Sequence, residues 1–596
     1  MQTTFLAQQF VPLMFAGLFV ILLTGFPVAF GLAATGLLFG FVGIEAGIFP
    51  PAMFQALPLR IFGIMQNDTL LAIPFFTFMG IILERSGMAE DLLETVGQVF
   101  GPVRGGVAIA VVLVGALLAA TTGVVAAAVI SMGLISLPVM LRYGYDRSIA
   151  TGVITASGTL AQAIPPSLVL IVLADQLGRS VGDMYSGALI PGLMLVGLYV
   201  LFIVVVAIFK PAMTPALPPE ALIYKEDNGS SGHKSLLFLV LICATVGFAW
   251  AHVHNGLMTR WLERSTESPA DEIVVLSLTL ASLTGLALAL LNRMVKLNLL
   301  SRLAEQVTFV LMPPLILIFL VLGTIFLGVA TPTEGGAMGA LGALILALGK
   351  RRLSMDLMKQ ALDNTAKLAS FVLFILIGST FFSFTFNAAD GHLWVEHLFT
   401  NMPGGAWGFL LVVNVLVFVL GCFIDFFEIA FIVIPLLAPV AEKILPGLVP
   451  GMSADQAMIW FGVILAMNLQ TSFLTPPFGF ALFYLRSVAA KFDYKDRVTG
   501  ETIKAVKTIE IYKGSIAFIA LQLIMLSAVI AFPALVTGGI EKEKTLSADE
   551  IMQQLDIRSG DQEAAPAAEP DVKAEDKPVA EEDPMKALLE STKQKK

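Results

Sequence analysis

Two proline pairs interrupt apolar segments of this chain at matching distances from polar side chains. Thr159 precedes Pro165-Pro166 by six residues, and Gln470 precedes Pro476-Pro477 by six. Proline lacks an amide donor and disfavours helix in the residue before it, so we expect both segments to unwind and leave carbonyl oxygens free. Corresponding interruptions in two halves of a chain are typical of a secondary transporter with its site near the membrane midplane. Two ordinary proline kinks are the alternative.

Each proline pair follows a long apolar block that is broken near its middle. Gly105–Leu141 has no ionisable side chain and is interrupted by Thr121-Thr122-Gly123, whereas Gly404–Ala441 is interrupted by Gly421 and two carboxylates. A bilayer core takes about 20 helical residues, so each block is too long for one span and leaves almost no loop between two. We therefore predict two re-entrant hairpins. Backbone at such a turn has to be buried in protein or line a watery cavity, which makes each turn a candidate ligand site.

The composition is that of a polytopic membrane protein. Mean hydropathy is +0.85, with 57% hydrophobic and 14% charged residues, and the apolar stretches provide roughly a dozen spans. The net charge of −9 arises largely in Glu541–Lys596, where 15 acidic residues face nine basic ones. The absence of a basic patch with interleaved aromatic residues argues against nucleic acid as a partner. Gly342–Lys350 lacks the glycine spacing and the Ser or Thr of a phosphate loop, so we expect no ATP hydrolysis.

We predict four segments. Residues 1–210 form a first transmembrane half containing the hairpin 105–141, and residues 304–540 form a second half containing the hairpin 404–441. Residues 211–303 between them comprise a polar linker and two further spans. Residues 541–596 form an acidic tail that is too polar to order itself.

The order of motifs resembles that of the large membrane subunit of the tripartite ATP-independent periplasmic (TRAP) transporters, of the dicarboxylate type. The resemblance covers most of both halves and rests on order and spacing together. Its motifs are Leu71–Phe76 with Gly80 and Arg85–Gly87, Pro138, Arg142–Tyr145, Ala156–Ser167, Ala330–Glu334, Asp425, and Asn468–Pro477.

The resemblance implies an all-α polytopic protein with inverted repeats, two re-entrant hairpins, unwound helices and an elevator mechanism. It also implies a bacterial inner-membrane carrier that is not an enzyme and has no cofactor besides coupling ions. The expected partners are a small membrane subunit, a periplasmic substrate-binding protein and the lipid bilayer. The expected activity is sodium-coupled uptake of a small organic anion, such as a dicarboxylate, a 2-oxo acid or a sugar acid.

Two sodium sites are implied, one at each hairpin with its facing unwound span. Sodium is a hard cation, and freed carbonyls and hydroxyls supply the oxygen ligands that it needs. The ligands expected at the first site are the hydroxyl of Thr122 and the carbonyls of Ala161, Ile164 and Pro166. The ligands expected at the second site are the carbonyls of Ser472 and Phe478 and the hydroxyl of Thr475. The alternative is that these small residues only allow helices to approach closely.

Three carboxylates are candidates for tuning a cation or carrying a proton: Asp425, Glu428 and Glu334. Ionisable residues within a membrane are costly and therefore suggest function. The alternatives are a solvated interfacial position for Asp425 and Glu428, and ordinary helix N-terminal chemistry for Glu334. The polar side chains expected to bind the substrate anion are Thr121, Ser157, Thr159, Ser379 and Thr380. Lys and Arg are absent from both hairpins, so we expect hydroxyls, helix N-terminal amides and sodium to meet the anion's charge.

Two other functions stay open at this point. A self-sufficient sodium- or proton-coupled anion carrier could share the broken-hairpin architecture. A membrane subunit of an ion-pumping enzyme is a third class, disfavoured because quinone or haem sites usually bring histidines into spans. Substrate identity does not follow from the sequence.

Overall fold

The chain folds into helices joined mostly by short connections, as described by a computed structural model. Within the described residues, the elements other than helices are two short antiparallel strands, β1 (Tyr494–Lys495) and β2 (Thr502–Ile503). In the part of the chain that the structure describes, ten helices are long and apolar enough to cross a membrane, or up to 11 if one bent pair counts as a single span. This confirms the predicted all-helical, multi-pass class. The described residues are 9–224, 232–261, 268–295, 299–400, 403–496 and 498–540, without the side chains of Leu23, Thr122 and Thr400.

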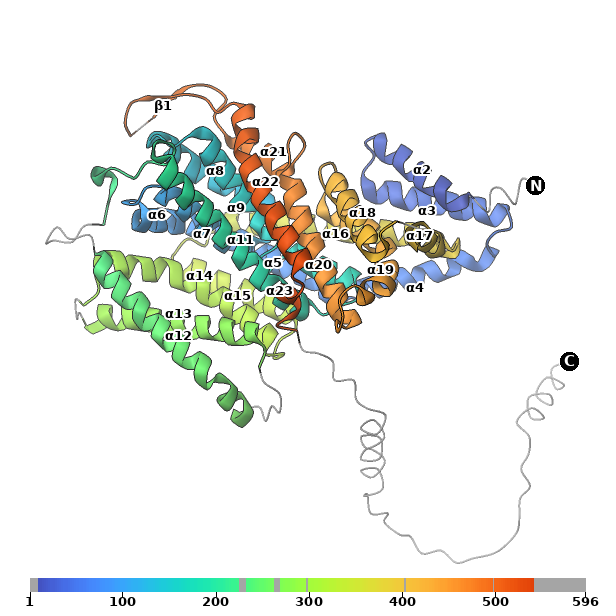
Figure 1. The fold of residues 1–596 in the computed structure, drawn as a ribbon, viewed down its shortest axis with the longest axis horizontal. Coiled ribbons are helices and arrows are strands. Elements are labelled where there is room, and N and C mark those ends of the chain that lie inside the picture. Colours follow the sequence, from blue (N-terminus) through green and yellow to red (C-terminus); the bar gives the residue numbers. More distant parts are fainter. Residues whose placement is uncertain are drawn as a thin grey trace, which may run out of the picture. The chain divides into compact units, whose positions relative to one another are not determined.

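The first half contains a helix pair at the first broken block, followed by a helix broken at the first proline pair (Figure 1). Its helices are α2 (Phe10–Leu23), α3 (Val28–Glu45), α4 (Leu57–Met65), α5 (Asp68–Arg85), α6 (Met88–Phe100), α7 (Gly106–Thr122), α8 (Val125–Arg142), α9 (Arg147–Thr159), α10 (Leu168–Gln176) and α11 (Val181–Phe209). Short 3₁₀ turns are η1 (Pro51–Ala56) before α4, η2 (Leu160–Gln162) after α9, and η3 (Pro211–Met213) and η4 (Pro219–Ala221) after α11. The segment containing η1 and α4 meets α5 at a bend of 45°.

The middle of the chain supplies four helices. They are α12 (His233–Trp261), α13 (Ala270–Val295), α14 (Arg302–Phe326) and α15 (Pro332–Gly349). The first two are the pair of spans expected between residues 211 and 303. Figure 1 shows them beside α14, at one end of the described fold, with α2 and α3 at the other end.

The second half repeats the order of elements seen in the first. Its helices are α16 (Met355–Ala388), α17 (Gly391–Thr400), α18 (Gly405–Gly421), α19 (Phe426–Ile444), α20 (Ala454–Leu474), α21 (Phe480–Val488), α22 (Thr508–Ala531) and α23 (Ala534–Thr537), with the 3₁₀ turn η5 (Leu445–Gly447) after α19. In each half, a long helix and a short helix lead into a helix pair, a broken helix and another long helix. The predicted acidic tail, residues 541–596, lies outside the described residues.

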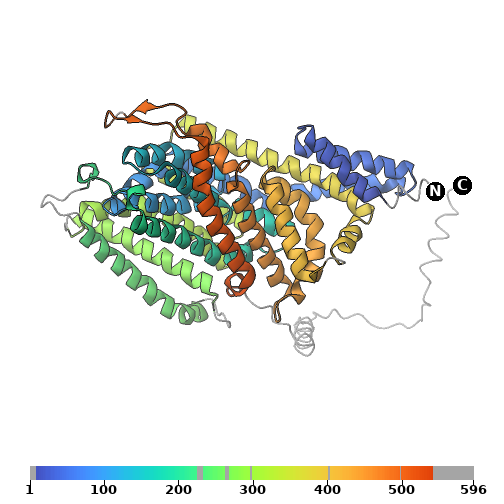
Figure 2. The ribbon, with the colours of Figure 1, turned by 45° about the horizontal axis from the view of Figure 1, so that its top comes forward.

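Several helix pairs approach so closely that only glycine fits between them. A Cβ on Gly36 of α3 would lie 2.5 Å from the backbone of Phe381 in α16, and one on Gly378 would lie 2.2 Å from the carbonyl oxygen of Ala29. Gly152 of α9 and Gly514 of α22 face each other in the same way. Figure 2 shows α22 as the long red-orange helix near the middle of the described fold. Small residues at helix contacts are the usual means of packing helices in membranes.

Candidate functional site

The first helix pair turns at Gly123, and this turn rests on the first broken helix. Gly123 has a φ of +60°, which favours glycine, and a Cβ there would lie 2.9 Å from Cγ of Leu168. Leu168 is the first residue of α10 and follows the cis Pro165-Pro166 bond by two residues. The hairpin turn and the proline break are thus in direct contact.

The predicted carbonyl ligands of the first site lie in this break. Ala161, Ile164 and Pro166 are buried. Among the hydrogen bonds of the described residues, none ends on these three carbonyl oxygens, whereas the neighbouring Leu160 carbonyl accepts from two backbone amides. Thr122 ends α7 at the same turn, but its side chain lies outside the described part of the chain. The ligand set therefore stays a prediction.

The second helix pair contacts its own broken helix in the same manner. A Cβ on Gly421, the last residue of α18, would lie 2.2 Å from Oγ of Ser472 and 2.9 Å from its Cβ. The rings of Phe423 and Phe478 are 4.9 Å apart. The hydroxyl of Thr475 donates to the Thr471 carbonyl over 2.8 Å, which leaves its oxygen lone pairs able to accept a cation. The assignment of Ser472, Thr475 and Phe478 as ligands stays a prediction.

The three candidate carboxylates all lie at helix starts. Asp425 caps α19, with its side chain accepting from the Phe426 amide over 2.6 Å, and Glu428 accepts from the Asp425 amide over 3.2 Å. Asp425 and Glu428 are thus at the second hairpin turn, each half-buried. Glu334 is exposed and accepts from the Thr331 amide over 2.8 Å at the start of α15. Its geometry matches the N-terminal alternative, because a capping box alone accounts for it.

The hydroxyls predicted to bind the substrate are dispersed over several helices. Thr121 donates to the Leu118 carbonyl, Ser157 to Val153, and Thr380 to Leu376, each within its own helix. Ser379 donates across to the Phe431 carbonyl of α19 over 2.5 Å. These hydroxyls do not line the cavities of the described residues that are considered below, and their assignment to the substrate stays a prediction.

Thr159 belongs to a buried polar cluster that sequence reasoning missed. Its hydroxyl lies 3.5 Å from Nε2 of Gln470 and 3.3 Å from Nε2 of Gln522, and Gln522 also donates to the Tyr199 hydroxyl over 2.8 Å. These four side chains come from α9, α20, α22 and α11 and join the two halves of the chain. Gln522 was detectable in principle, because it is an amide within the long apolar run that forms α22.

A cavity of about 290 Å³ lies beside the first hairpin turn. Its wall includes Val124, Ala126 and Ala127 at the start of α8, together with residues of α5 and α16. The start of α8 has no side-chain cap, so its first amides remain available, and such amides favour an anion. The buried Thr77 hydroxyl in the wall has no hydrogen-bond partner. These groups suit the binding of a small anion.

The same cavity contains an arginine that sequence reasoning did not assign to a site. Arg85, at the end of α5, lines the cavity. Its NH1 group donates a hydrogen bond to Oε1 of Gln360 over 2.5 Å. Glu84 also lines it and accepts from the Ser131 hydroxyl of α8 over 2.5 Å. Arg85 lies outside both predicted hairpins, on α5, which packs against α7 of the first hairpin.

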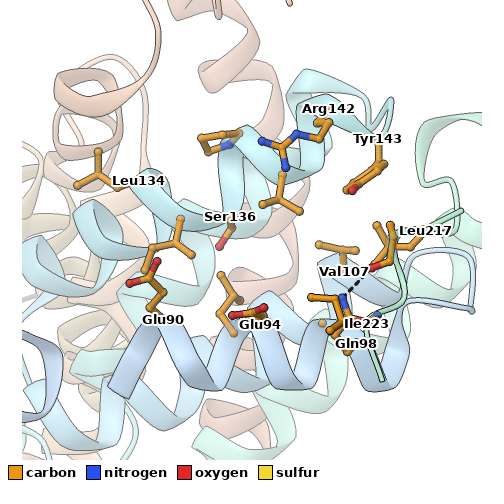
Figure 3. A pocket seen from close by; sticks show the side chains of 16 residues that line it. Glu90, Glu94, Gln98, Val107, Leu134, Ser136, Arg142, Tyr143, Leu217 and Ile223 are labelled. Carbon is orange, nitrogen blue, oxygen red and sulfur yellow. Dashed lines mark hydrogen bonds between the residues drawn. The ribbon is translucent and has the colours of Figure 1, made fainter. Parts of the chain in front are cut away.

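A larger cavity of about 570 Å³ lies away from both hairpin turns, between α6, α8 and the linker after α11 (Figure 3). Glu90 and Glu94 of α6 face Arg142 across it. Arg142 is already engaged by Asp496, with NH2 2.9 Å from Oδ1. This hydrogen-bonded guanidinium holds the pKa of Asp496 well below its usual range. With two carboxylates and a committed arginine, this cavity is a poor site for an anion.

Comparisons with known proteins agree on one family. A family model described as "Tripartite ATP-independent periplasmic transporter, DctM component" matches residues 15–535. The C4-dicarboxylate TRAP transporter large permease protein DctM of Pseudomonas aeruginosa is 26% identical over 442 residues, covering 74% of this chain and 82% of the relative. The isethionate TRAP transporter permease protein DctMQ of Oleidesulfovibrio alaskensis is 24% identical, covering 82% and 62%. The ectoine TRAP transporter large permease protein TeaC of Halomonas elongata is 28% identical over 202 residues, covering 34% and 46%.

Proposed function

This chain belongs to the DctM-component family of tripartite ATP-independent periplasmic transporters, and we propose that it couples uptake of a small organic anion to inward sodium movement. It is the large permease subunit of a transporter and a multi-pass protein of the inner membrane. A TRAP system also comprises a periplasmic binding protein and a small permease, and in the DctMQ relative the name joins both permeases. We propose that this chain works with a periplasmic binding protein and with a small permease that is a separate chain.

One observation carries the sodium proposal: each hairpin turn rests on a proline break that presents backbone oxygens. Gly123 contacts Leu168 at the first break, and Gly421 contacts Ser472 at the second. Sodium binding at both junctions would lock each hairpin onto its broken helix. The proposed ligands are Thr122, Ala161, Ile164 and Pro166 at the first junction and Ser472, Thr475 and Phe478 at the second.

The recurring element order supports an inverted repeat. Ion pairs place the start of α9 beside the start of α22, through Arg147 and Glu510, and the end of α15 beside α6, through Lys350 and Asp91. At the opposite end of the spans, Arg179 after α10 pairs with Glu442 of α19. These contacts support opposite orientations for the two hairpins, with the first opening toward one membrane side and the second toward the other. We propose that the hairpins, broken helices, α11 and α22 move together against α3, α5, α15 and α16.

The distribution of basic residues supports an orientation. The end that carries the base of the first hairpin is rich in lysine and arginine, including Arg104, Arg142, Lys350, Arg351 and Arg352. Basic residues favour the cytoplasmic side of a membrane protein. We therefore place the first hairpin's base in the cytoplasm and the second hairpin's base in the periplasm.

We propose that the substrate carries a carboxylate or a comparable acid and passes through the 290 Å³ cavity beside the first hairpin. Arg85, the Thr77 hydroxyl and the free amides at the start of α8 would meet the acid group. The names of relatives point to C4-dicarboxylates, isethionate and ectoine as substrates of those proteins. A C4-dicarboxylate is the first compound to test.

The test is uptake into proteoliposomes containing this chain and the small membrane subunit, with the cognate binding protein and the labelled anion outside. We expect uptake to require both an inward sodium gradient and the binding protein. Uptake that persists with potassium in place of sodium would refute the coupling. Uptake that is unaffected by omitting the binding protein would favour the self-sufficient carrier.

The anion contact is tested separately. We expect Arg85→Gln to raise the KM for the anion while leaving the sodium dependence unchanged. Lys359→Gln is the matched control, because Lys359 is exposed on α16 near the same membrane side and does not line the cavity. Equal changes in the KM for the anion in the two variants would show that Arg85 does not contact the anion.

A further inference from the structure

A third cavity, of about 480 Å³, is lined throughout by apolar residues and lies within the membrane-spanning part of the fold. It lies where α12, α13 and α14 meet α6, α7 and α11. Ile164 and Pro165 of the first broken helix form part of its wall. None of its lining residues is polar, so it has no features that would orient a polar substrate.

A basic rim lies at one end of this cavity, near the lining residues Phe100, Leu236 and Val307. The starts of α12 and α14 are held together there, because the Ser301 amide donates to the Ser235 hydroxyl over 3.0 Å. This bond brings the neighbouring Lys234 and Arg302 close to each other, and both are exposed.

The end of α6 reaches the same rim. Nε2 of His233, the first residue of α12, lies 3.0 Å from the carbonyl oxygen of Val99, which lines the cavity. Arg104 follows four residues after Phe100 and is exposed. Three Lys and Arg residues and one acidic residue, Glu305, occur in the segments that meet here, which are residues 97–105, 232–236 and 299–306. These three segments therefore carry a formal net charge of +2, with His233 neutral.

We propose that one acyl chain of an anionic glycerophospholipid fills this cavity, with its headgroup at the rim formed by Arg104, Lys234 and Arg302. Basic pockets between transmembrane helices on the cytoplasmic side are known sites for acidic lipid headgroups. A membrane-spanning helix, about 10 Å wide and 30 Å long, has a volume on the order of 2,000 Å³ and does not fit. The cavity volume instead lies within the range of small-molecule sites, about 300–1,000 Å³.

This site gives the lipid a position against the first hairpin. The chain would touch α7 and the Ile164–Pro165 break on one side and α12 to α14 on the other. The proposal rests on the membrane location of the chain and on the orientation proposed above, and it is independent of the substrate and of the coupling ion.

The test is native mass spectrometry of the delipidated full chain, titrated with phosphatidylglycerol or phosphatidylcholine. We expect one molecule of phosphatidylglycerol to bind tightly and phosphatidylcholine to bind more weakly. Leu278→Trp should fill the cavity and abolish the tight binding. Leu283→Trp is the matched control, since Leu283 lies on the same helix with 43% exposure against 41% for Leu278, and does not line the cavity.

The headgroup is tested by Arg104→Gln and Lys234→Gln. We expect each substitution to lower the affinity for phosphatidylglycerol about fivefold and to change the affinity for phosphatidylcholine little. Arg260→Gln, at the other end of α12, is the control. Equal binding of both lipids would overturn the anionic headgroup. Equal lipid retention by Leu278→Trp and Leu283→Trp, or loss of the lipid when the small subunit is added, would overturn the site.

Discussion

The contact between the second hairpin turn and its broken helix can be tested by one methyl group. In Gly421→Ala the new Cβ would lie 2.2 Å from Oγ and 2.9 Å from Cβ of Ser472. The Ser472 hydroxyl donates to the Leu469 carbonyl over 2.8 Å and could rotate, but the Cβ atoms would still overlap. The turn and the broken helix would therefore have to separate.

The magnitude follows from two opposing effects. Overpacking of this kind costs about 1–3 kcal/mol, whereas alanine in place of glycine within a helix gains about 1 kcal/mol. Gly421→Ala alone should therefore be destabilising or, at the lower limit of the overpacking cost, neutral. In a Ser472→Gly background the overlap disappears and only the helix gain remains. The two substitutions should couple favourably by about 1–3 kcal/mol.

The assay is a double-mutant cycle on the detergent-purified chain, with the unfolding midpoint as one readout and the sodium concentration for half-maximal uptake as the other. We expect Gly421→Ala to raise the sodium requirement and Gly421→Ala with Ser472→Gly to restore it. Additive effects on stability would refute the contact itself. If the double substitution restored stability but not the sodium requirement, the contact would be supported and the proposal of a second sodium site would be refuted.

Three further predictions concern other parts of the fold. Thr122→Ala should raise the sodium requirement without changing the unfolding midpoint, whereas Thr121→Ala should leave the sodium requirement unchanged; equal sodium dependence in both would count against the first site. Gln522→Leu should destabilise the chain by about 1–3 kcal/mol, because it leaves the Tyr199 hydroxyl without its 2.8 Å donor. In a Tyr199→Phe background the same substitution should lower the free energy of unfolding by less, as measured by chemical denaturation in a double-mutant cycle. The lowered pKa of Asp496 means that this carboxyl stabilises the fold above its unfolded pKa of about 3.9 and loses that contribution as pH falls toward the folded value. Limited proteolysis of residues 489–507 should therefore accelerate below about pH 4, and in Asp496→Asn it should be fast already at neutral pH.

The helix pairs at the two apolar blocks and the helix breaks at the proline pairs were predictable because their causes are local. Proline removes amide donors wherever it stands, and an apolar block of about twice the bilayer length has to turn. The glycines at both turns, Gly123 and Gly421, also stand within the sequence interruptions. The helix bounds, the β1–β2 pair and the close contact of α3 with α16 were not predictable in the same way, because they depend on tertiary packing.

The candidate anion site shows why local reasoning is incomplete. Arg85 stands 38 residues before Gly123 in the chain, and nothing in their spacing indicates that they share a cavity. Long-range packing of α5 against the first hairpin makes Arg85 available to an anion there. The absence of basic residues from the hairpins therefore did not mean an absence of positive charge at the hairpin turn.

The polar cluster gives the six-residue spacing a structural meaning. Thr159 and Gln470 were notable only because each stands six residues before a proline pair. In the fold the Thr159 hydroxyl and Nε2 of Gln470 lie 3.5 Å apart, and both side chains are fully buried. The contact joins corresponding positions of the two breaks and is consistent with the proposed repeat. Because Tyr199 and Gln522 tie the same contact to α11 and α22, a cation-induced shift at one break would be transmitted to the other through buried hydrogen bonds, which are costly to leave unmade.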